Sequence, residues 1–67
     1  MDYCALIAKN LKKHRFELHL SQEKFSEILD IHTNYYSALE RGERNPTLKV
    51  LEKISNNLNI SLVDLLK

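Results

Sequence analysis

Hydrophobic residues recur at the spacing of an α-helix in five successive segments of this 67-residue chain. The first segment runs from about Tyr3 to Leu18, and its apolar stripe is formed by Ile7, Leu11 and Leu18. Its lysines are expected to lie mostly on the solvated faces of the same helix: Lys9, Lys12 and Lys13. The pattern therefore predicts an amphipathic first helix.

A second, shorter helix is predicted over Gln22–Leu29. Ser21 precedes it as an N-cap, because its hydroxyl can accept a hydrogen bond from an unpaired backbone N–H. The pattern buries Phe25 together with either Ile28 or Leu29, and does not decide between the last two. Residue 26 is a serine, small enough for another helix to approach closely.

A third helix, Thr33–Arg41, follows after only three residues, 30–32. Asp30 is expected to take the left-handed conformation of a tight turn, which Asp tolerates better than most residues. Tyr36 and Leu39 face inward, and Gly42 ends the helix. Two helices of about eight residues joined by such a turn form the helix-turn-helix arrangement.

The last two segments begin with residues that favour helix N-termini. Thr47 caps a fourth helix whose apolar stripe is Leu48, Leu51, Ile54 and Leu58. Ser61 caps a short fifth helix, and Asp64 resembles the carboxylate of a capping box. The chain has one Gly and one Pro, which argues against a sheet built on hairpins. The expected fold is all-α, a compact five-helix domain.

Size and composition place limits on the function. Residues 1–67 make at most one domain, with a core small enough that a partner subunit would help stabilise it. Cys4 is the only cysteine, so no disulfide forms within the chain, which fits a reducing compartment. No segment is expected to cross a membrane or act as a signal peptide, so we expect a cytoplasmic protein. The net charge of +1 is uninformative.

The segment from Ser21 onward resembles the helix-turn-helix domain shared by the phage lambda and 434 repressors, Cro and Xre-type regulators. The matching pieces are Ser21-Gln22, Ser26, Ile31, Leu39-Glu40-Arg41-Gly42 and Thr47. The resemblance covers about residues 5 to 66, with the helix-turn-helix core at 21–41. It implies a lambda-repressor-like fold and a sequence-specific, DNA-binding transcriptional regulator. Within the family, "NYYSALERGERNPTL" is most similar to the controller proteins of restriction–modification systems.

The chain departs from the family pattern at three positions. Asp30 replaces the usual turn glycine, Ser26 a small apolar residue, and Tyr36 a frequent isoleucine. Each replacement can be accommodated sterically, so the expected fold is unchanged. Thr33, Asn34 and Ala38 match no specific member, so the DNA sequence that is bound stays undetermined.

The resemblance implies that the start of the third helix enters the major groove of DNA. Asn34 is the first candidate for a base contact, because its amide can pair with N6 and N7 of adenine. Thr33 is the second, through its hydroxyl or methyl group. Further candidates on the same face are Ser37, Ala38 and His32. The alternative is that these are solvated residues of an ordinary helix.

Phosphate contacts are implied on both sides of this helix. Gln22 lies at the start of the second helix, where backbone N–H groups favour anions. Arg44 and Asn45 lie in the loop that runs along the DNA backbone in family members. Lys49 could extend this contact or be solvated. The hydroxyl of Tyr35 could meet a phosphate, or its ring could pack on the second helix.

Two further groups of residues are assigned to structure and assembly. Family members carry a partly buried ion pair at the positions of Arg15 and Glu40, which ties the first helix to the third. At the last helix, Leu62, Leu65 and Leu66 can pack onto the fourth helix, which leaves Val63 as a surplus apolar residue. The surplus predicts a dimer interface made by Val63 with its neighbours Ile60 and Leu66. The resemblance thus implies a homodimer on (pseudo)palindromic DNA.

Other classes of function have less support. The potential soft ligands are Cys4, His14, His19 and His32, and His14 and His19 are five residues apart, which does not stack them on one helical face. We therefore expect no catalytic site, no metal and no cofactor. An antitoxin-like or protein-interaction module, using the same fold without base readout, is the alternative function. RNA polymerase is a further candidate partner, and the pattern does not distinguish an activator from a repressor.

Overall fold

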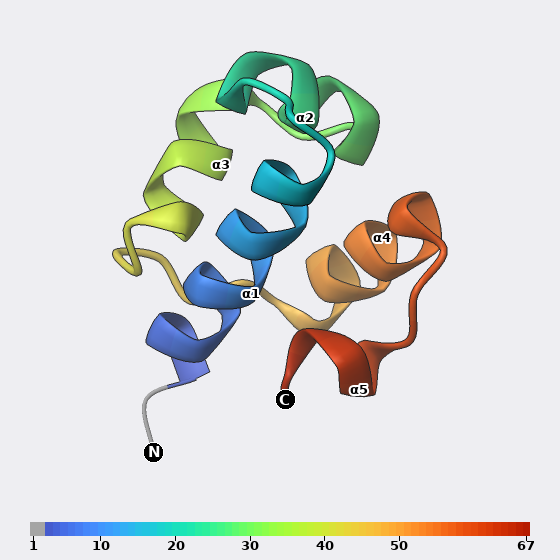
Figure 1. Ribbon diagram of the computed structural model, residues 1–67. Helices are drawn as coiled ribbons and strands as arrows, with labels where there is room; N and C mark the ends of the chain where they lie inside the picture. Colours follow the sequence, from blue (N-terminus) through green and yellow to red (C-terminus); the bar gives the residue numbers. More distant parts are fainter. Residues whose placement is uncertain (1–2) are drawn as a thin grey trace.

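The computed structural model describes residues 3–67, and within that range every regular element is an α-helix. In chain order the helices are α1 (Tyr3–Glu17), α2 (Gln22–Leu29), α3 (Thr33–Glu40), α4 (Leu48–Leu58) and α5 (Leu62–Leu65). In Figure 1, α1 runs through the middle of the molecule, α2 and α3 lie above and to its left, and α4 and α5 lie to its right and below. The predicted all-α fold of five helices is confirmed.

The helix boundaries follow from local capping chemistry. The hydroxyls of Ser21, Thr47 and Ser61 each accept a hydrogen bond from the backbone N–H three residues later, as predicted. Asp30 takes the left-handed conformation, with φ 59° and ψ 45°, and ends α2. Asn59 does the same at the end of α4, with φ 57°. Short polar side chains tolerate this conformation, which makes both turns tight.

The core lies where α1, α2 and α3 meet α4 and α5. Its buried residues are Ile7, Leu11, Phe25, Leu29, Tyr36, Leu39, Ile54 and Leu65. The rings of Phe25 and Tyr36 meet edge to face, with centroids 5.4 Å apart, and join α2 to α3. The choice between Ile28 and Leu29 is now decided, because Leu29 is fully buried and Ile28 is 45% exposed.

Two residues of the predicted apolar stripes are exposed. Leu18 lies outside α1, which ends at Glu17, and the chain turns through His19 with φ 57°. This turn carries the Leu18 side chain away from the stripe, and it is 51% exposed. Leu48 occupies the first position of α4, before the helix reaches the core, and is 64% exposed. Both predictions were wrong because a residue at a helix terminus can lie beyond the neighbouring helices that cover the apolar stripe.

Side-chain amides fasten α4 and α5 to the rest of the molecule. Asn57 donates from Nδ2 to the backbone oxygen of Leu29 at 2.8 Å. Asn10 of α1 donates from Nδ2 to the backbone oxygen of Leu65 at 2.6 Å. The two bonds satisfy carbonyl groups near the ends of α2 and α5. None of the helices described here has both the length and the apolar character needed to span a membrane.

Candidate nucleic-acid interface

The N-terminal end of α3 presents Asn34 to solvent on a firmly held helix. Asn34 and His32 are exposed, whereas Thr33, Ser37 and Ala38 are partly buried. Within residues 3–67 the side-chain amide of Asn34 makes no hydrogen bond, so its donor and acceptor both remain available. This is the arrangement required for pairing with the edge of a base.

His32 has a structural role that the sequence did not reveal. Its Nδ1 accepts a hydrogen bond from the backbone N–H of Asn34 at 3.1 Å, so His32 is the N-cap of α3. Histidine is an uncommon N-cap, and the usual preference for Ser, Thr, Asp and Asn offers no signal for it. The cap orders the turn that carries Asn34.

The hydroxyl of Thr33 is used to join α2 to α3. Ser26 donates its hydroxyl proton to the backbone oxygen of Glu23 at 2.8 Å. The 2.9 Å bond between the hydroxyls of Ser26 and Thr33 therefore has Thr33 as its donor. Thr33 keeps a free acceptor position and its methyl group for a ligand.

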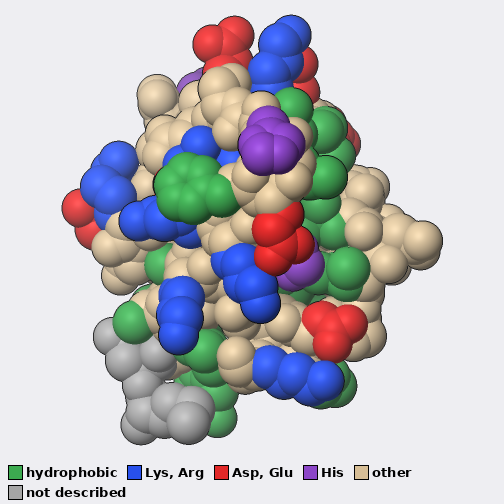
Figure 2. Space-filling view, in the orientation of Figure 1, with side chains coloured by type: hydrophobic (Ala, Val, Ile, Leu, Met, Phe, Trp, Pro, Cys, Tyr) green, Lys and Arg blue, Asp and Glu red, His purple; other side chains and the backbone are tan. Residues whose placement is uncertain are grey.

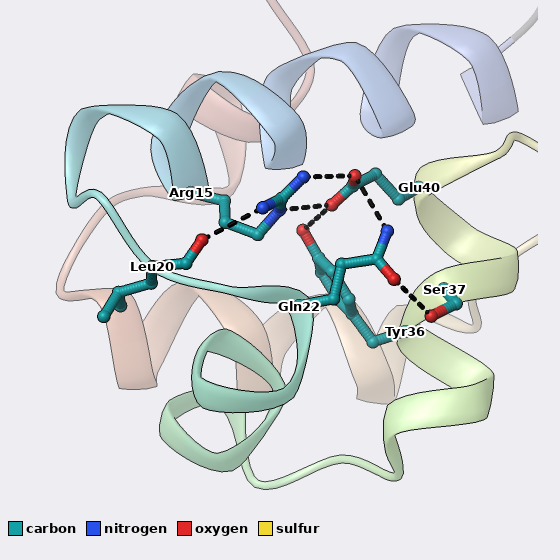
Figure 3. Close-up of polar contacts among 6 residues, drawn as sticks. All are labelled: Arg15, Leu20, Gln22, Tyr36, Ser37 and Glu40. Atoms are coloured by element: carbon teal, nitrogen blue, oxygen red, sulfur yellow. Dashed lines mark hydrogen bonds and ion pairs between the residues drawn. The ribbon is translucent and has the colours of Figure 1, made fainter.

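The side chain of Gln22 connects the start of α2 to α3 as well. Ser37 donates from its hydroxyl to Gln22 Oε1 at 2.7 Å, and Gln22 Nε2 donates to Glu40 Oε1 at 3.1 Å (Figure 3). One N–H of the Gln22 amide and the backbone N–H groups at the start of α2 remain for a phosphate. Ser37, predicted as a base contact, holds Gln22 in place and can still accept a hydrogen bond.

The predicted ion pair between Arg15 and Glu40 is present and lies beneath this surface (Figure 3). Arg15 donates from Nε and Nη2 to the two carboxylate oxygens at 2.9 and 2.8 Å, and from Nη1 to the Leu20 backbone oxygen at 2.9 Å. Tyr36 also donates its hydroxyl to Glu40 Oε2 at 2.5 Å. Glu40 is only 5% exposed. Sequence reasoning did not foresee that Tyr36 and Gln22 belong to this network.

The network determines the charge of its members. Burial by itself raises the pKa of Glu40, but hydrogen bonds from Arg15, Tyr36 and Gln22 outweigh burial and lower that pKa to about 2. The hydrogen bond to Glu40 raises the pKa of Arg15. Burial, followed by the carboxylate, raises the pKa of the Tyr36 hydroxyl. Glu40 and Arg15 are therefore both charged at neutral pH.

A prediction for acid stability follows from the lowered pKa of Glu40. Its carboxylate stabilises the folded protein above its ordinary pKa of 4.5, and this contribution is lost as the pH falls from 4.5 towards about 2. The loss should be on the order of 3 kcal/mol. Free energies of unfolding, measured by urea titration between these pH values, should show it in the wild type. In Glu40→Gln the decline should be smaller, since no carboxylate remains to titrate; an equal decline in both proteins would contradict the assignment.

The loop after α3 carries the predicted phosphate contacts. The guanidinium carbon of Arg44 lies 5.5 Å from the ring centroid of Tyr35, in a cation–π contact that joins the loop to α3. The Tyr35 ring is partly buried and packs against the core. Asn45 Oδ1 accepts a hydrogen bond from the Cys4 thiol, with an S···O distance of 3.3 Å. The Nδ2 donors of Asn45 take no part in this bond. Lys49 is exposed in the first turn of α4.

The structure thus links several predicted residues into one surface. Gln22 contacts Ser37, and Arg44 contacts Tyr35, so the start of α2, the outer face of α3 and the following loop are joined. Lys49 forms no hydrogen bond or ion pair with these residues in the described part of the chain. No cluster of three or more His, Cys, Asp or Glu residues suited to a metal occurs within residues 3–67.

The predicted dimer residues lie at the other end of the molecule, around α5. Val63 is 61% exposed and Leu66 is 38% exposed, whereas Ile60 is half-buried and packs against the core. The exposed part of this group is therefore Val63 and Leu66.

Comparison with known proteins agrees with this geometry. A family model described as "Helix-turn-helix" matches residues 9–65. The control protein C.SmaI of Serratia marcescens is 39% identical over 66 residues, covering 98% of this chain and 79% of that protein. The crystal structure of a hypothetical transcription factor NHTF from Neisseria superposes with a TM-score of 0.89 at 30% identity, covering 98% and 76% of the two chains. The wild-type restriction-modification controller protein C.Esp1396I superposes with a TM-score of 0.82 at 29% identity, covering 98% and 88%.

These matches confirm the resemblance inferred from the sequence, including its extent over nearly the whole chain. The chain therefore belongs to the helix-turn-helix family of DNA-binding transcriptional regulators, and restriction–modification control proteins are among its relatives.

Proposed function

We propose that this protein binds a pseudo-palindromic operator as a homodimer and controls transcription in the manner of a restriction–modification controller protein. The observation that carries the proposal is the exposed side-chain amide of Asn34, which makes no hydrogen bond within residues 3–67. It lies at the front of a helix that contacts with α1 and α2 hold in place. The similarity to the control proteins C.SmaI and C.Esp1396I supports the assignment to this type of regulator. Since an operator lies on the DNA of the cell, the proposed function implies that this protein acts in the cytoplasm.

Base reading is assigned to the outer face of α3. Asn34 offers both a donor and an acceptor, the combination that recognises adenine in the major groove. Thr33 contributes an acceptor and a methyl group, and Ala38 can touch the methyl group of thymine. The His32 cap and the contacts with Ser26 and Gln22 hold α3 in place. Little conformational entropy is therefore lost when α3 binds DNA.

Phosphate contacts are assigned to the two flanks of α3. On one flank, backbone N–H groups at the start of α2 and the free N–H of Gln22 point to one strand of the duplex. On the other flank, Arg44, Asn45 and Lys49 supply charge and donors for the second strand. The stacking of Arg44 on Tyr35 orders the guanidinium without neutralising its charge.

Dimerisation is assigned to the exposed apolar side chains of α5. Val63 and Leu66 leave apolar surface uncovered, and the Asn10–Leu65 bond holds α5 in place on α1. A two-fold dimer would present two copies of α3 to half-sites about 34 Å apart. Footprinting of the DNA upstream of the gene tests the whole proposal. Failure to protect any DNA, with the fold intact, would favour a protein-interaction module instead, and RNA polymerase would be the first partner to test.

Asn34→Ala should reduce affinity for the cognate operator by about 1–3 kcal/mol and leave binding to random duplexes nearly unchanged. The physical reason is the loss of one donor–acceptor pair with a base edge. Preference should relax at one base-pair position in each half-site. The measurement is a fluorescence anisotropy titration against the operator and its single-base variants at one salt concentration. If preference were unchanged at every position while helicity was retained, Asn34 would face water or a phosphate.

Arg44→Ala should weaken binding to the operator and to random duplexes alike. Loss of one phosphate contact should also reduce the slope of log K against log salt by about one unit. Titrations over a series of salt concentrations measure both effects. Glu43→Ala is the matched control, because it removes a charged side chain from the same loop but no cation. A loss confined to the operator would mean that Arg44 reads a base.

A further inference from the structure

A stripe of three lysines and one phenylalanine on α1 has no role in the fold or in the proposed contact with DNA. Lys9, Lys12, Lys13 and Phe16 are spaced i, i+3, i+4 and i+7, so they lie on one face of the helix. All four are exposed. Figure 2 shows Lys and Arg side chains gathered around an apolar side chain on the face over α1 and the C-terminal end of α3. The stripe is distinct from the outer face of α3, to which base reading is assigned.

The stripe borders a groove between α1 and the turn that ends α3. The groove is open to solvent and has a volume of about 700 Å³, and Ala5, Ala8 and Gly42 are among the residues that line it. A Cβ added at Gly42 would lie 3.9 Å from Ala5 Cα, so α1 and the turn approach closely here. Ala5 and Ala8 have short side chains and Gly42 has none, so this part of the groove is left open by the side chains of residues 3–67.

Phe16 is held in position at the groove without being buried. It is 58% exposed, and the guanidinium carbon of Arg15 lies 4.7 Å from its ring centroid. Arg15 is itself fixed by two hydrogen bonds to Glu40. An aromatic ring that is exposed and already ordered loses little freedom on binding, as in the anchors of protein interfaces.

The charges around the groove are unbalanced. Within residues 3–67, Lys9, Lys12 and Lys13 have no carboxylate partner within 4 Å. Arg41 is paired with Glu43 at 3.0 Å, and Glu17 supplies one exposed carboxylate at the edge. Like charges at i and i+4, such as Lys9 and Lys13, weaken an isolated helix by about 0.2–0.5 kcal/mol. The fold therefore retains a mildly destabilising basic stripe.

We propose that this groove binds an acidic amphipathic helix of a partner protein. An apolar side chain of that helix would fill the hollow beside Phe16, and its carboxylates would pair with Lys9, Lys12 and Lys13. Helix-in-groove recognition uses this combination of apolar anchors and charged flanks. DNA phosphates would also attract the lysines, but they would leave the aromatic ring and the apolar hollow unused. The binding mode is independent of the contacts assigned to α3.

A phage-displayed library of random peptides of about 16 residues, long enough for roughly four helical turns, tests the proposal. The wild-type protein is the bait, and Phe16→Ala is kept for the binding measurements that follow. Selected peptides should be acidic and carry apolar residues at i, i+3 or i+4, and i+7. A synthetic copy of the most enriched peptide should bind about tenfold or more weakly to Phe16→Ala and to the double variant Lys12→Glu/Lys13→Glu. Its affinity should also fall with rising salt.

Leu18→Ala is the matched control, because Leu18 is similarly exposed near the same end of α1 but does not line the groove. It should bind the peptide like the wild type, and circular dichroism should show that every variant is folded. Three results would overturn the proposal: no enrichment, enrichment of peptides that bind Phe16→Ala equally well, or an equal loss in Leu18→Ala. It would also be overturned if Lys12→Glu/Lys13→Glu lost operator affinity with a smaller salt slope, because the lysines would then contact phosphates.

Discussion

Glu40→Ala is expected to lower the free energy of unfolding by about 3–5 kcal/mol. The carboxylate accepts hydrogen bonds from Arg15, Tyr36 and Gln22, and no buried side-chain N or O atom in residues 3–67 lacks a partner. Its removal would leave the Arg15 guanidinium, whose side chain is 13% exposed, without a counter-charge. For a domain of this size the midpoint of thermal unfolding should fall by more than about 12 °C.

The measurement is urea unfolding followed by circular dichroism, with all proteins at one concentration because dimerisation contributes to stability. Arg41→Ala is the matched control, since the Arg41–Glu43 pair is more than half exposed on both sides and should contribute at most about 1 kcal/mol. Replacing both charges, as in Arg15→Leu with Glu40→Leu, should recover part of the loss because no unpaired charge remains. A loss in Glu40→Ala no larger than that of Arg41→Ala would show that the network does not stabilise the fold.

Val63→Asp is expected to separate the proposed dimer and to weaken operator binding by about 100-fold or more. A carboxylate at a residue that is 61% exposed costs the monomer little, but in an apolar contact between two copies it would be desolvated and would face its symmetry mate. A monomer would then bind each half-site separately and lose the gain that comes from linking two sites. Sedimentation velocity and operator titrations measure the two effects.

Leu18→Asp is the control for this change, because it places the same charge at an exposed leucine just after α1, far from α5 in the sequence. It should leave both association and operator affinity unchanged. A wild type that is monomeric at roughly ten micromolar, well above the concentrations at which regulator dimers act, would contradict the proposed interface. So would a Val63→Asp variant that remains a dimer.

Much of this fold could be predicted because its signals are local. Ser21, Thr47 and Ser61 cap helices through hydrogen bonds to a backbone N–H three residues away, and Asp30 turns the chain through its own backbone conformation. Such interactions depend on residue type and spacing alone, so the sequence contains them in full. The Arg15–Glu40 pair, 25 residues apart, was foreseen only through the resemblance to a known family.

Predictions failed or stayed open where the outcome depends on how the helices pack. Whether Ile28 or Leu29 is buried depends on the rotation of α2 against its neighbours, and the two side chains are too alike for periodicity to separate them. Leu18 and Leu48 continue apolar stripes in the sequence but lie at helix ends, beyond the reach of the core. An apolar residue at a helix terminus is thus a weak guide to burial.

The amino-acid sequence by itself determined that the chain forms five helices, that the second and third form a helix-turn-helix, and that Asn34 lies at the front of the third. Only the tertiary structure decided which polar groups remain free to bind a ligand. Thr33, Ser37 and Gln22 have the chemistry of DNA contacts, yet their side chains also bond to Ser26, to each other and to Glu40. The physical reason is that a hydrogen bond requires two groups within about 3 Å, and helix packing alone brings groups from different helices that close.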